Sequence, residues 1–280
     1  MRRPLPAILM VLLLAQSPLN IACADEPARR VDVCVYGATA SGVIAAVAAR
    51  QEGCTVVLVE PSRWAGGILG AGIKPMQDCA EPKAVGGLTA KCVFAMGKQP
   101  DVIRRDFAAW LQREQIPVIF EHRVQRVEKS GSTIARITLE LAPPDEQAVP
   151  APMAVKKDAA TIEAKVFIDA SYEGDLMALA GVHYAVGRES AGDYNEKLAG
   201  VGPPTNWTPI DPYVTPGDPK SGLLPLLDED HGRSRGAADE YTQAYNYRFY
   251  VTSDPAKRAS FEKPANCNPK DYELVGRYVE

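Results

Sequence analysis

The sequence predicts an α/β fold in which a helix connects two parallel strands. Residues 31–36 form a short apolar, β-branched run that is typical of a buried strand, and residues 55–59 form a second one. Between them, residues 43–52 are rich in alanine and carry larger apolar side chains on one face, which predicts a helix. The order strand, helix, strand is that of a βαβ unit, whose two strands lie parallel in one sheet.

The turn between the first strand and the helix has the composition of a phosphate-binding turn. Its six residues are all small: Gly37, Ala38, Thr39, Ala40, Ser41 and Gly42. A helix that begins directly after a strand directs free backbone N–H groups and its positive dipole end towards a ligand at the turn, so a pyrophosphate fits there. We expect Gly37 to allow the tight turn and Gly42 to let the helix pack closely on the sheet. The alternative is an ordinary βαβ unit without a ligand.

Thr39 and Glu60 decide how well this part of the chain matches the dinucleotide-binding fingerprint. The turn departs from the fingerprint at Thr39, where a second glycine is expected so that the backbone can approach phosphate. The second strand agrees with it, because the strand ends at Glu60, whose carboxylate could accept hydrogen bonds from an adenosine ribose. The six small residues and Glu60 are therefore predicted to bind a dinucleotide.

Three stretches of the sequence resemble one family of flavoproteins. They are GATASG from Gly37, LVEPSRWAGGILGAG from Leu58 and VFIDASYEGDLMALAGVHYAVGRES from Val166. In this order they resemble the FAD-dependent oxidoreductase family of glutathione-reductase-like flavoproteins, and within it the secreted bacterial branch. The resemblance extends from Val31 almost to Glu280. It implies FAD as the cofactor and is specific for no substrate.

The resemblance adds four residues to the predicted FAD site. Gly66 and Gly67 match a glycine pair that runs alongside the flavin dinucleotide in the family, and an NAD-binding domain does not require this element. Val124 matches a position that offers backbone groups to the adenine, and Asp169 matches a strand-end turn that closes over the nucleotide. The residues alone leave alternatives open. Val124 could lie in a plain surface hairpin, and Asp169 and Asp175 could cap the following helix.

Two domains are expected after the signal peptide. The resemblance implies a Rossmann-like FAD-binding domain over residues 25–181, with a mixed sheet and an inserted β-hairpin, and part of a mainly β substrate domain over residues 182–280. The residue pattern predicts helices over 101–115 and 175–180, strands over 118–120 and 161–168, a hairpin of 122–127 and 132–141, and strands over 183–188 and 241–252.

The end of the sequence predicts a fragment. Residues 271–280 have apolar side chains at helical spacing and no residue that would stop a helix. In the family, the chain returns from the substrate domain to complete the FAD domain. We therefore expect an N-terminal fragment that lacks the flavin-ring half of the site.

Residues 1–24 are predicted to be a cleaved secretory signal peptide. Two arginines precede an apolar core over residues 7–15, and Ala22-Cys23-Ala24 provides a small-residue cleavage site. We expect cleavage after Ala24 and a secreted or periplasmic protein, with a lipoprotein anchor at Cys23 as the less favoured alternative. The apolar core is too short to span a bilayer, so no stable membrane anchor is expected.

Charge and cysteine usage limit the partners. The formal net charge of −4 becomes more negative when the leader is removed with its two arginines, which argues against nucleic acid and favours a small-molecule substrate. No metal site is predicted, because the cysteines lack the close spacing of iron–sulfur ligands. Cys79 and Cys92 could pair, but an odd number of cysteines remains after cleavage: Cys34, Cys54, Cys79, Cys92 and Cys267. The oligomeric state is not set by the sequence.

No catalytic residue can be assigned from the sequence, because the flavin itself accepts the hydride or electrons. The chain has three histidines, and such residues more often serve as surface or hydrogen-bonded side chains than as catalysts. They are His122, His183 and His231. Arg188, Tyr247 and Arg248 lie in predicted strands of the substrate domain and could bind an anionic or sugar-like substrate.

Three classes of function follow. The favoured one is a secreted FAD-dependent oxidoreductase that acts on a small organic or carbohydrate-derived substrate. The second is an NAD-using dehydrogenase, which Glu60 allows but the glycine pair does not require. The third is a non-catalytic or polysaccharide-associated protein, because some members of the family that the chain resembles carry polysaccharide-lyase names.

Overall fold

The structure, a computed structural model, describes residues 28–72, 81–97, 99–146, 148–202, 210–227, 234–242, 251–260 and 262–279. The chain divides into two compact units, Met1–Val182 and His183–Glu280. The predicted signal peptide, with its cleavage after Ala24, lies outside the described residues, as do Cys79, His231, Tyr247 and Arg248.

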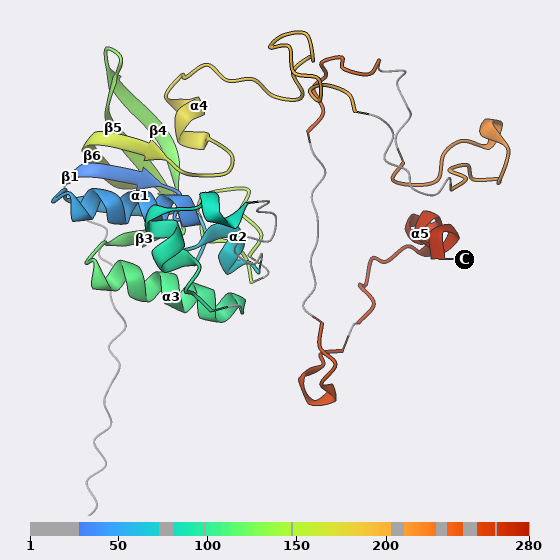
Figure 1. The fold of residues 1–280 in the computed structure, drawn as a ribbon, viewed down its shortest axis with the longest axis horizontal. Helices are drawn as coiled ribbons and strands as arrows, with labels where there is room; N and C mark the ends of the chain where they lie inside the picture. The colour runs from blue at the N-terminus through green and yellow to red at the C-terminus, as the bar shows by residue number, and fades with distance from the viewer. Residues whose placement is uncertain are drawn as a thin grey trace, which may run out of the picture. The chain divides into compact units, whose positions relative to one another are not determined.

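One mixed sheet of six strands forms the framework of the first unit (Figure 1). Its strand order is β3-β2-β1-β6-β5-β4. β1 pairs in parallel with β2 and β6, and β2 with β3, whereas β5 runs antiparallel to both β6 and β4. The bounds are β1 Arg29–Tyr36, β2 Val56–Glu60, β3 Val118–Phe120, β4 His122–Ser130, β5 Thr133–Leu141 and β6 Lys156–Asp169. The predicted α/β class with a mixed sheet and a β-hairpin is confirmed.

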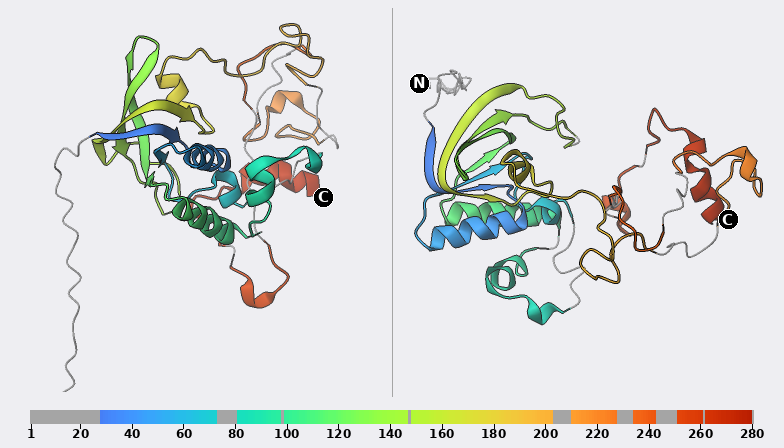
Figure 2. Two further views of the ribbon diagram at one scale, coloured as in Figure 1. Left: turned by 60° about the vertical axis from the view of Figure 1, so that its left-hand side comes forward. Right: turned by 90° about the horizontal axis from the view of Figure 1, so that it is seen from above.

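Helices cover one face of this sheet. α1 and α3 lie together on that face, and the strands curl away from them when the unit is seen from above (Figure 2, right). Four α-helices belong to the described part of this unit, together with two shorter helical segments. They are α1 Ala40–Gln51, α2 Gly67–Gly70, α3 Pro100–Arg113 and α4 Asp175–Leu179, the 3₁₀ turn η1 Pro82–Ala84 and the π-helix η2 Thr89–Val93.

Alternating side chains of β1 supply two separate cores. Val33 and Val35 face α1 and α3, whereas Cys34 and Tyr36 face a second apolar cluster under β4, β5 and α4. This division follows from the strand period of two residues. Cys34 is fully buried and unpaired, and burial raises the pKa of its thiol to about 12. The thiol therefore stays protonated and behaves as a small apolar group.

The register of β1 places three strand ends at one edge of the sheet. Tyr36, the last residue of β1, pairs with Val59 of β2 on one side and with Asp169 of β6 on the other. The turns that follow these strands therefore meet at the carboxyl edge of the parallel strands. This is where open α/β sheets bind their ligands.

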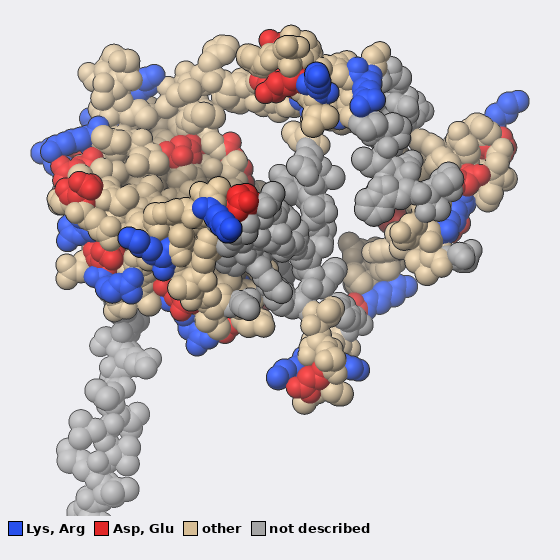
Figure 3. Space-filling model, in the orientation of Figure 1, with Lys and Arg blue, Asp and Glu red and all other residues tan. Residues whose placement is uncertain are grey.

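Ion pairs hold the exposed side of the β4–β5 hairpin. Glu128 contacts Arg136 at 3.0 Å and Arg126 at 3.5 Å, and Arg126 also contacts Asp158. Basic and acidic side chains lie next to one another on the face of the first unit drawn in Figure 3. Exposed pairs of this kind each contribute at most about 1 kcal/mol, so the hairpin depends mainly on its buried apolar face.

The described residues of the second unit, taken by itself, contain little β structure. Its described residues form three short 3₁₀ segments and one α-helix: η3 Pro219–Ser221, η4 Pro255–Lys257, η5 Pro269–Tyr272 and α5 Glu273–Val279. Two isolated bridges, Arg188 with Asp239 and Tyr213 with Leu223, are the β-type pairings among them. The prediction of a strand over 183–188 is therefore wrong. Most of the predicted strand over 241–252 lies outside the described residues.

The predicted strand over 183–188 is absent because the apolar side chains of this unit are little buried. Leu224 is buried in this unit, whereas Leu198 and Leu226 are more than four-fifths exposed. Alternating apolar residues form a strand only when a neighbouring strand pairs with them and a core covers one face. The helical spacing at the end of the chain does predict α5 correctly.

The described residues contain neither a membrane-spanning helix nor a cluster of metal ligands. No described helix is long and apolar enough to cross a bilayer. Among the same residues, no group of three His, Cys, Asp or Glu side chains could hold a metal ion.

Substitution of Gly42 tests the packing of α1 against the turn before it. A Cβ at this residue would lie 1.9 Å from the carbonyl oxygen of Gly37, so Gly42→Val forces the helix away from the turn. We expect the free energy of unfolding to fall by roughly 3 kcal/mol, measured by urea denaturation without any ligand. Gly86→Val is the control, because a Cβ there meets nothing within 4 Å. Equal stability of the Gly42 variant and this control would contradict the close contact.

Candidate functional site

The turn after β1 is shaped by Gly37. Its φ is +96°, and a Cβ there would lie 2.7 Å from the amide nitrogen of Ser171 and 2.8 Å from the carbonyl carbon of Ala170. Only glycine accepts both the left-handed backbone and the close approach of the turn after β6. Ala40 and Ser41 open α1, whose first turn carries no acidic side chain. The amide groups at this end of the helix can therefore bind an anion.

Thr39 has a structural role in place of the expected second glycine. Its φ is −62°, which any residue adopts. Its hydroxyl accepts a hydrogen bond from the amide of Gly42 at 3.2 Å and donates one to the carbonyl oxygen of Ala170 at 2.8 Å. Thr39 is thus the N-cap of α1 and also fixes the helix to the end of β6.

Glu60 joins the two loops that follow β1 and β2. One carboxylate oxygen accepts the amide N–H of Ala38 at 2.6 Å, and the other accepts the amide N–H of Ser62 at 2.8 Å. The residue is 8% exposed and lines a cavity. Each oxygen of a carboxylate can accept a second hydrogen bond, so the residue retains capacity for the hydroxyl groups of a ribose.

A second glycine turn lies against the first one. Gly66 donates its amide to the carbonyl oxygen of Ala38 at 2.7 Å, and its φ is +101°. A Cβ at Gly66 would lie 2.5 Å from the ring of Phe107, and one at Gly67 would lie 2.2 Å from the hydroxyl of Tyr172. Both glycines therefore make room for aromatic side chains of the protein itself.

α3 supports this second turn. Arg104 donates to the carbonyl oxygen of Gly70 at 2.6 Å, and its guanidinium lies 4.3 Å from the ring centre of Trp64. Such cation–π contacts contribute about 0.5–1 kcal/mol at exposed sites.

Asp169 is the residue that caps α4. It accepts the amide and the hydroxyl of Ser171 at 3.0 and 2.7 Å, and the amide of Met177 at 2.8 Å. The alternative interpretation, in which Asp169 and Asp175 cap this helix, therefore holds for Asp169. Asp175 makes no such cap, since the N-cap residue is Gly174 and has no capping side chain, but Asp175 lines the cavity.

Val124 lies in β4 and is buried rather than on a plain surface hairpin. Its amide donates to the hydroxyl of Tyr36 at 3.4 Å. Burial raises the pKa of this hydroxyl, so it remains protonated. Val124 does not line the cavity, although its neighbour Arg123 does.

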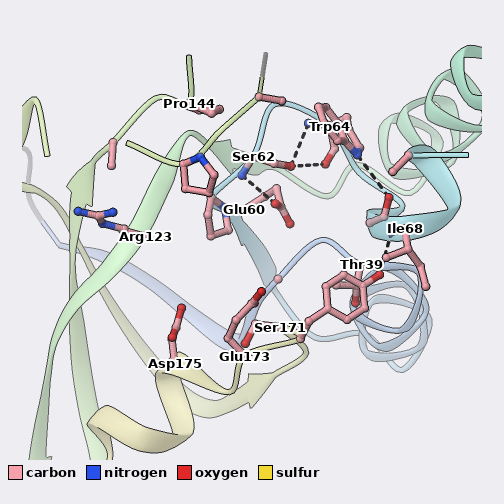
Figure 4. A pocket seen from close by; sticks show the side chains of 18 residues that line it. Thr39, Glu60, Ser62, Trp64, Ile68, Arg123, Pro144, Ser171, Glu173 and Asp175 are labelled. Carbon is pink, nitrogen blue, oxygen red and sulfur yellow. Dashed lines mark hydrogen bonds between the residues drawn. The ribbon is translucent and has the colours of Figure 1, made fainter. Parts of the chain in front are cut away.

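The two turns and the β4–β5 region enclose a cavity of about 300 Å³. Figure 4 shows Glu60, Ser62 and Trp64 on one side of it and Ser171, Glu173 and Asp175 on another. Four of the predicted residues line this cavity: Gly37, Thr39, Glu60 and Gly67. Seven do not: Ala38, Ala40, Ser41, Gly42, Gly66, Val124 and Asp169. Whether any of these eleven residues contacts the cofactor stays a prediction.

Sequence reasoning missed most of the other lining residues. They include Ser62, Trp64, Ile68, Arg123, Pro144, Pro150, Tyr172 and Glu173. A usable signal existed for two of them, because Ser62 and Trp64 stand between the acidic end of β2 and the glycine pair. The residues of the loop after β5 gave no local signal.

That loop is held over the cavity by two arginines. Arg63 donates to the carbonyl oxygens of Pro144 and Asp145 and also pairs with Glu121 at 2.8 Å. Arg123 donates to the carbonyl oxygen of Ala151 at 2.7 Å. The apolar side chains of this loop therefore form a fixed wall of the cavity.

Two of the predicted substrate and histidine residues, Arg188 and His122, each make a contact within their own unit. Arg188 forms a two-point ion pair with Asp239, including Nε to Oδ1 at 2.9 Å. His122 bonds the carbonyl oxygen of Phe120 through Nδ1 at 2.7 Å. Both contacts hold the protein's own structure and give no evidence of a catalytic role.

Comparison with known proteins defines the family. The model of the family described as "FAD dependent oxidoreductase" matches residues 32–280. The chain therefore belongs to the FAD-dependent oxidoreductase family, and FAD is its cofactor. No curated protein matches the sequence at a significant level.

Solved structures to which part of the chain is similar include three from microorganisms. A geranylgeranyl bacteriochlorophyll reductase-like protein from Thermoplasma acidophilum is 16% identical, with a TM-score of 0.36 over 56% of this chain and 43% of that chain. PqsL, a probable FAD-dependent monooxygenase from Pseudomonas aeruginosa, is 18% identical, with a TM-score of 0.36 over 57% of this chain and 48% of that one. L-proline dehydrogenase from P. horikoshii is 20% identical, with a TM-score of 0.33 over 52% and 24%. The chain spans less than half of the length of each of these three proteins.

Glu60→Gln separates the folding role of this carboxylate from its role at the cavity. An amide NH₂ cannot accept a hydrogen bond, so one of the two backbone N–H groups loses its partner. We expect the free energy of unfolding to fall by about 1–3 kcal/mol and the dissociation constant for ADP to rise roughly tenfold or more. Denaturation and calorimetric titration measure these two effects separately.

Glu52→Gln is the matched control, because Glu52 lies exposed at the end of α1. An unchanged affinity for ADP in the Glu60 variant would contradict the assignment of Glu60 to the ribose. An unchanged stability would contradict the two backbone hydrogen bonds.

Proposed function

We propose that the chain acts as a secreted FAD-dependent oxidoreductase on a small organic or carbohydrate-derived substrate, and that its first unit holds the adenosine and pyrophosphate half of FAD. The observation that carries this proposal is the meeting of two glycine turns and Glu60 at the carboxyl ends of β1, β2 and β6.

The described residues fit this half of the cofactor. The first turn presents the backbone amides at the start of α1 to the pyrophosphate, and Gly37 adds no side chain to this turn. Glu60 would bind the ribose, and the wall that includes Pro144 and Pro150 offers apolar surface to the adenine base. When bound, FAD accepts a hydride or an electron pair from the substrate. The contribution of these residues is to hold and orient the dinucleotide.

Two further parts of the proposal rest on the sequence. Export is supported by the charged, apolar and small-residue order of residues 1–24. The acidic net charge argues against nucleic acid as a partner and so favours a small-molecule substrate. No residue is assigned to the chemical step.

Competition among parts of the cofactor tests the proposal. We expect the 280-residue chain to bind ADP nearly as tightly as FAD, because the cavity fits the half of FAD that ADP represents. Riboflavin, which lacks that half, should not compete. The quenching of FAD fluorescence on binding measures the affinity for FAD. Displacement of the bound FAD by ADP or by riboflavin measures the affinities for these two ligands.

Circular dichroism first establishes that the protein is folded. Binding of neither FAD nor ADP by the folded chain would overturn the proposal. Displacement of FAD by riboflavin but not by ADP would place the site at the flavin ring instead.

A further inference from the structure

Tyr172 lies between the two glycine turns and lines the cavity. Its hydroxyl accepts a hydrogen bond from the amide of Ile68 at 2.9 Å. A Cβ at Gly67 would lie 2.2 Å from this hydroxyl and 3.2 Å from the Cα of Thr39. The absence of a side chain at Gly67 therefore lets the hydroxyl lie beside the first turn, close to the start of α1.

The donor capacity of this hydroxyl remains for a ligand. A tyrosine hydroxyl both accepts and donates, and here the accepting side is used by Ile68. Among the described residues, none accepts a hydrogen bond from it. Tyr172 is 57% exposed, and its partial burial together with the nearby carboxylates of Glu60 and Glu173 raises the pKa of the phenol, which keeps its proton at neutral pH.

The chemistry of the surroundings indicates which atom accepts this proton. The neighbouring start of α1 presents backbone amides and carries no acidic side chain in its first turn, so it favours an anionic group. A phenol donates strongly to an ionised oxygen, because charge-assisted hydrogen bonds are shorter and stronger than neutral ones.

We propose that Tyr172 donates a hydrogen bond to a phosphate oxygen of the bound dinucleotide, and that Gly67 lacks a side chain to admit this hydroxyl. The inference rests on the proposed function, because it needs the dinucleotide in this cavity. It assigns to Tyr172 a cofactor-positioning role. It also explains the glycine at residue 67 by a contact within the protein, because a side chain there would collide with the hydroxyl of Tyr172. Ile68 holds the phenol in place, so the hydroxyl is oriented before the ligand binds.

Tyr172→Phe tests the phosphate contact in the full chain. The variant keeps the ring and removes the hydroxyl, so we expect the dissociation constants for ADP and FAD to rise roughly tenfold. The dissociation constant for adenosine, which has no phosphate, should change less than about twofold. Calorimetric titration of the three ligands gives the ratio of adenosine to ADP affinity, which a purely structural role would not change. Tyr194→Phe, at a tyrosine that is 70% exposed in the second unit, is the matched control.

The outcomes separate this inference from the proposed function. Equal weakening of adenosine and ADP, or no change in either, overturns the phosphate contact while wild-type binding still supports the proposed function. Failure of the wild-type chain to bind either ligand overturns both proposals.

A second variant tests the same contact from the other side. Gly67→Ala places a methyl group against the hydroxyl, so it should lower the melting temperature and weaken ADP binding. The loss of melting temperature should be smaller in the Tyr172→Phe background, where the hydroxyl is gone. An equal loss in both backgrounds would show that Gly67 does not make room for Tyr172.

Discussion

The carboxylate of Glu60 is the interaction on which the site depends. It ends β2 and accepts amides from the turn after β1 and from the loop that leads to the second glycine turn. A buried carboxylate is costly unless hydrogen bonds satisfy it, and here two backbone N–H groups do so. The same residue therefore keeps the two turns together and presents its remaining lone pairs to a ligand. The position of this one carboxylate at the end of β2 therefore accounts for both its structural role and its proposed binding role.

Close backbone contact is the second constraint. Gly37 admits the turn after β6, Gly66 admits the ring of Phe107, and Gly67 admits the hydroxyl of Tyr172. The resemblance to flavoproteins assigns the glycine pair to the cofactor. In this structure the pair is needed for packing as well, and packing creates the shape of the cavity. A glycine at a ligand site can thus serve the ligand indirectly, by letting another side chain reach it.

The sequence was sufficient for features with a local cause. Period and composition predicted β1, α1 and β2, and the small residues of the turn predicted its geometry. Contacts between distant residues had no local pattern. Tyr172 and Ile68 are 104 positions apart, and Thr39 and Ala170 are 131 apart. β6 begins at Lys156, five residues before the predicted start, because its early residues pair with β5. The alternating residues 183–188 failed as a signal because, in the part of the second unit that the structure describes, their β-type pairing is a single bridge from Arg188 to Asp239.

Hydrogen–deuterium exchange with and without ADP tests the central claim most directly. The account predicts that ADP slows exchange in three segments, residues 37–42, 60–68 and 171–177, because the two turns and the end of β6 meet at one cavity. Exchange in the described parts of the second unit should stay unchanged. Protection confined to the second unit, or protection of only one of the three segments, would contradict a single site built from these turns.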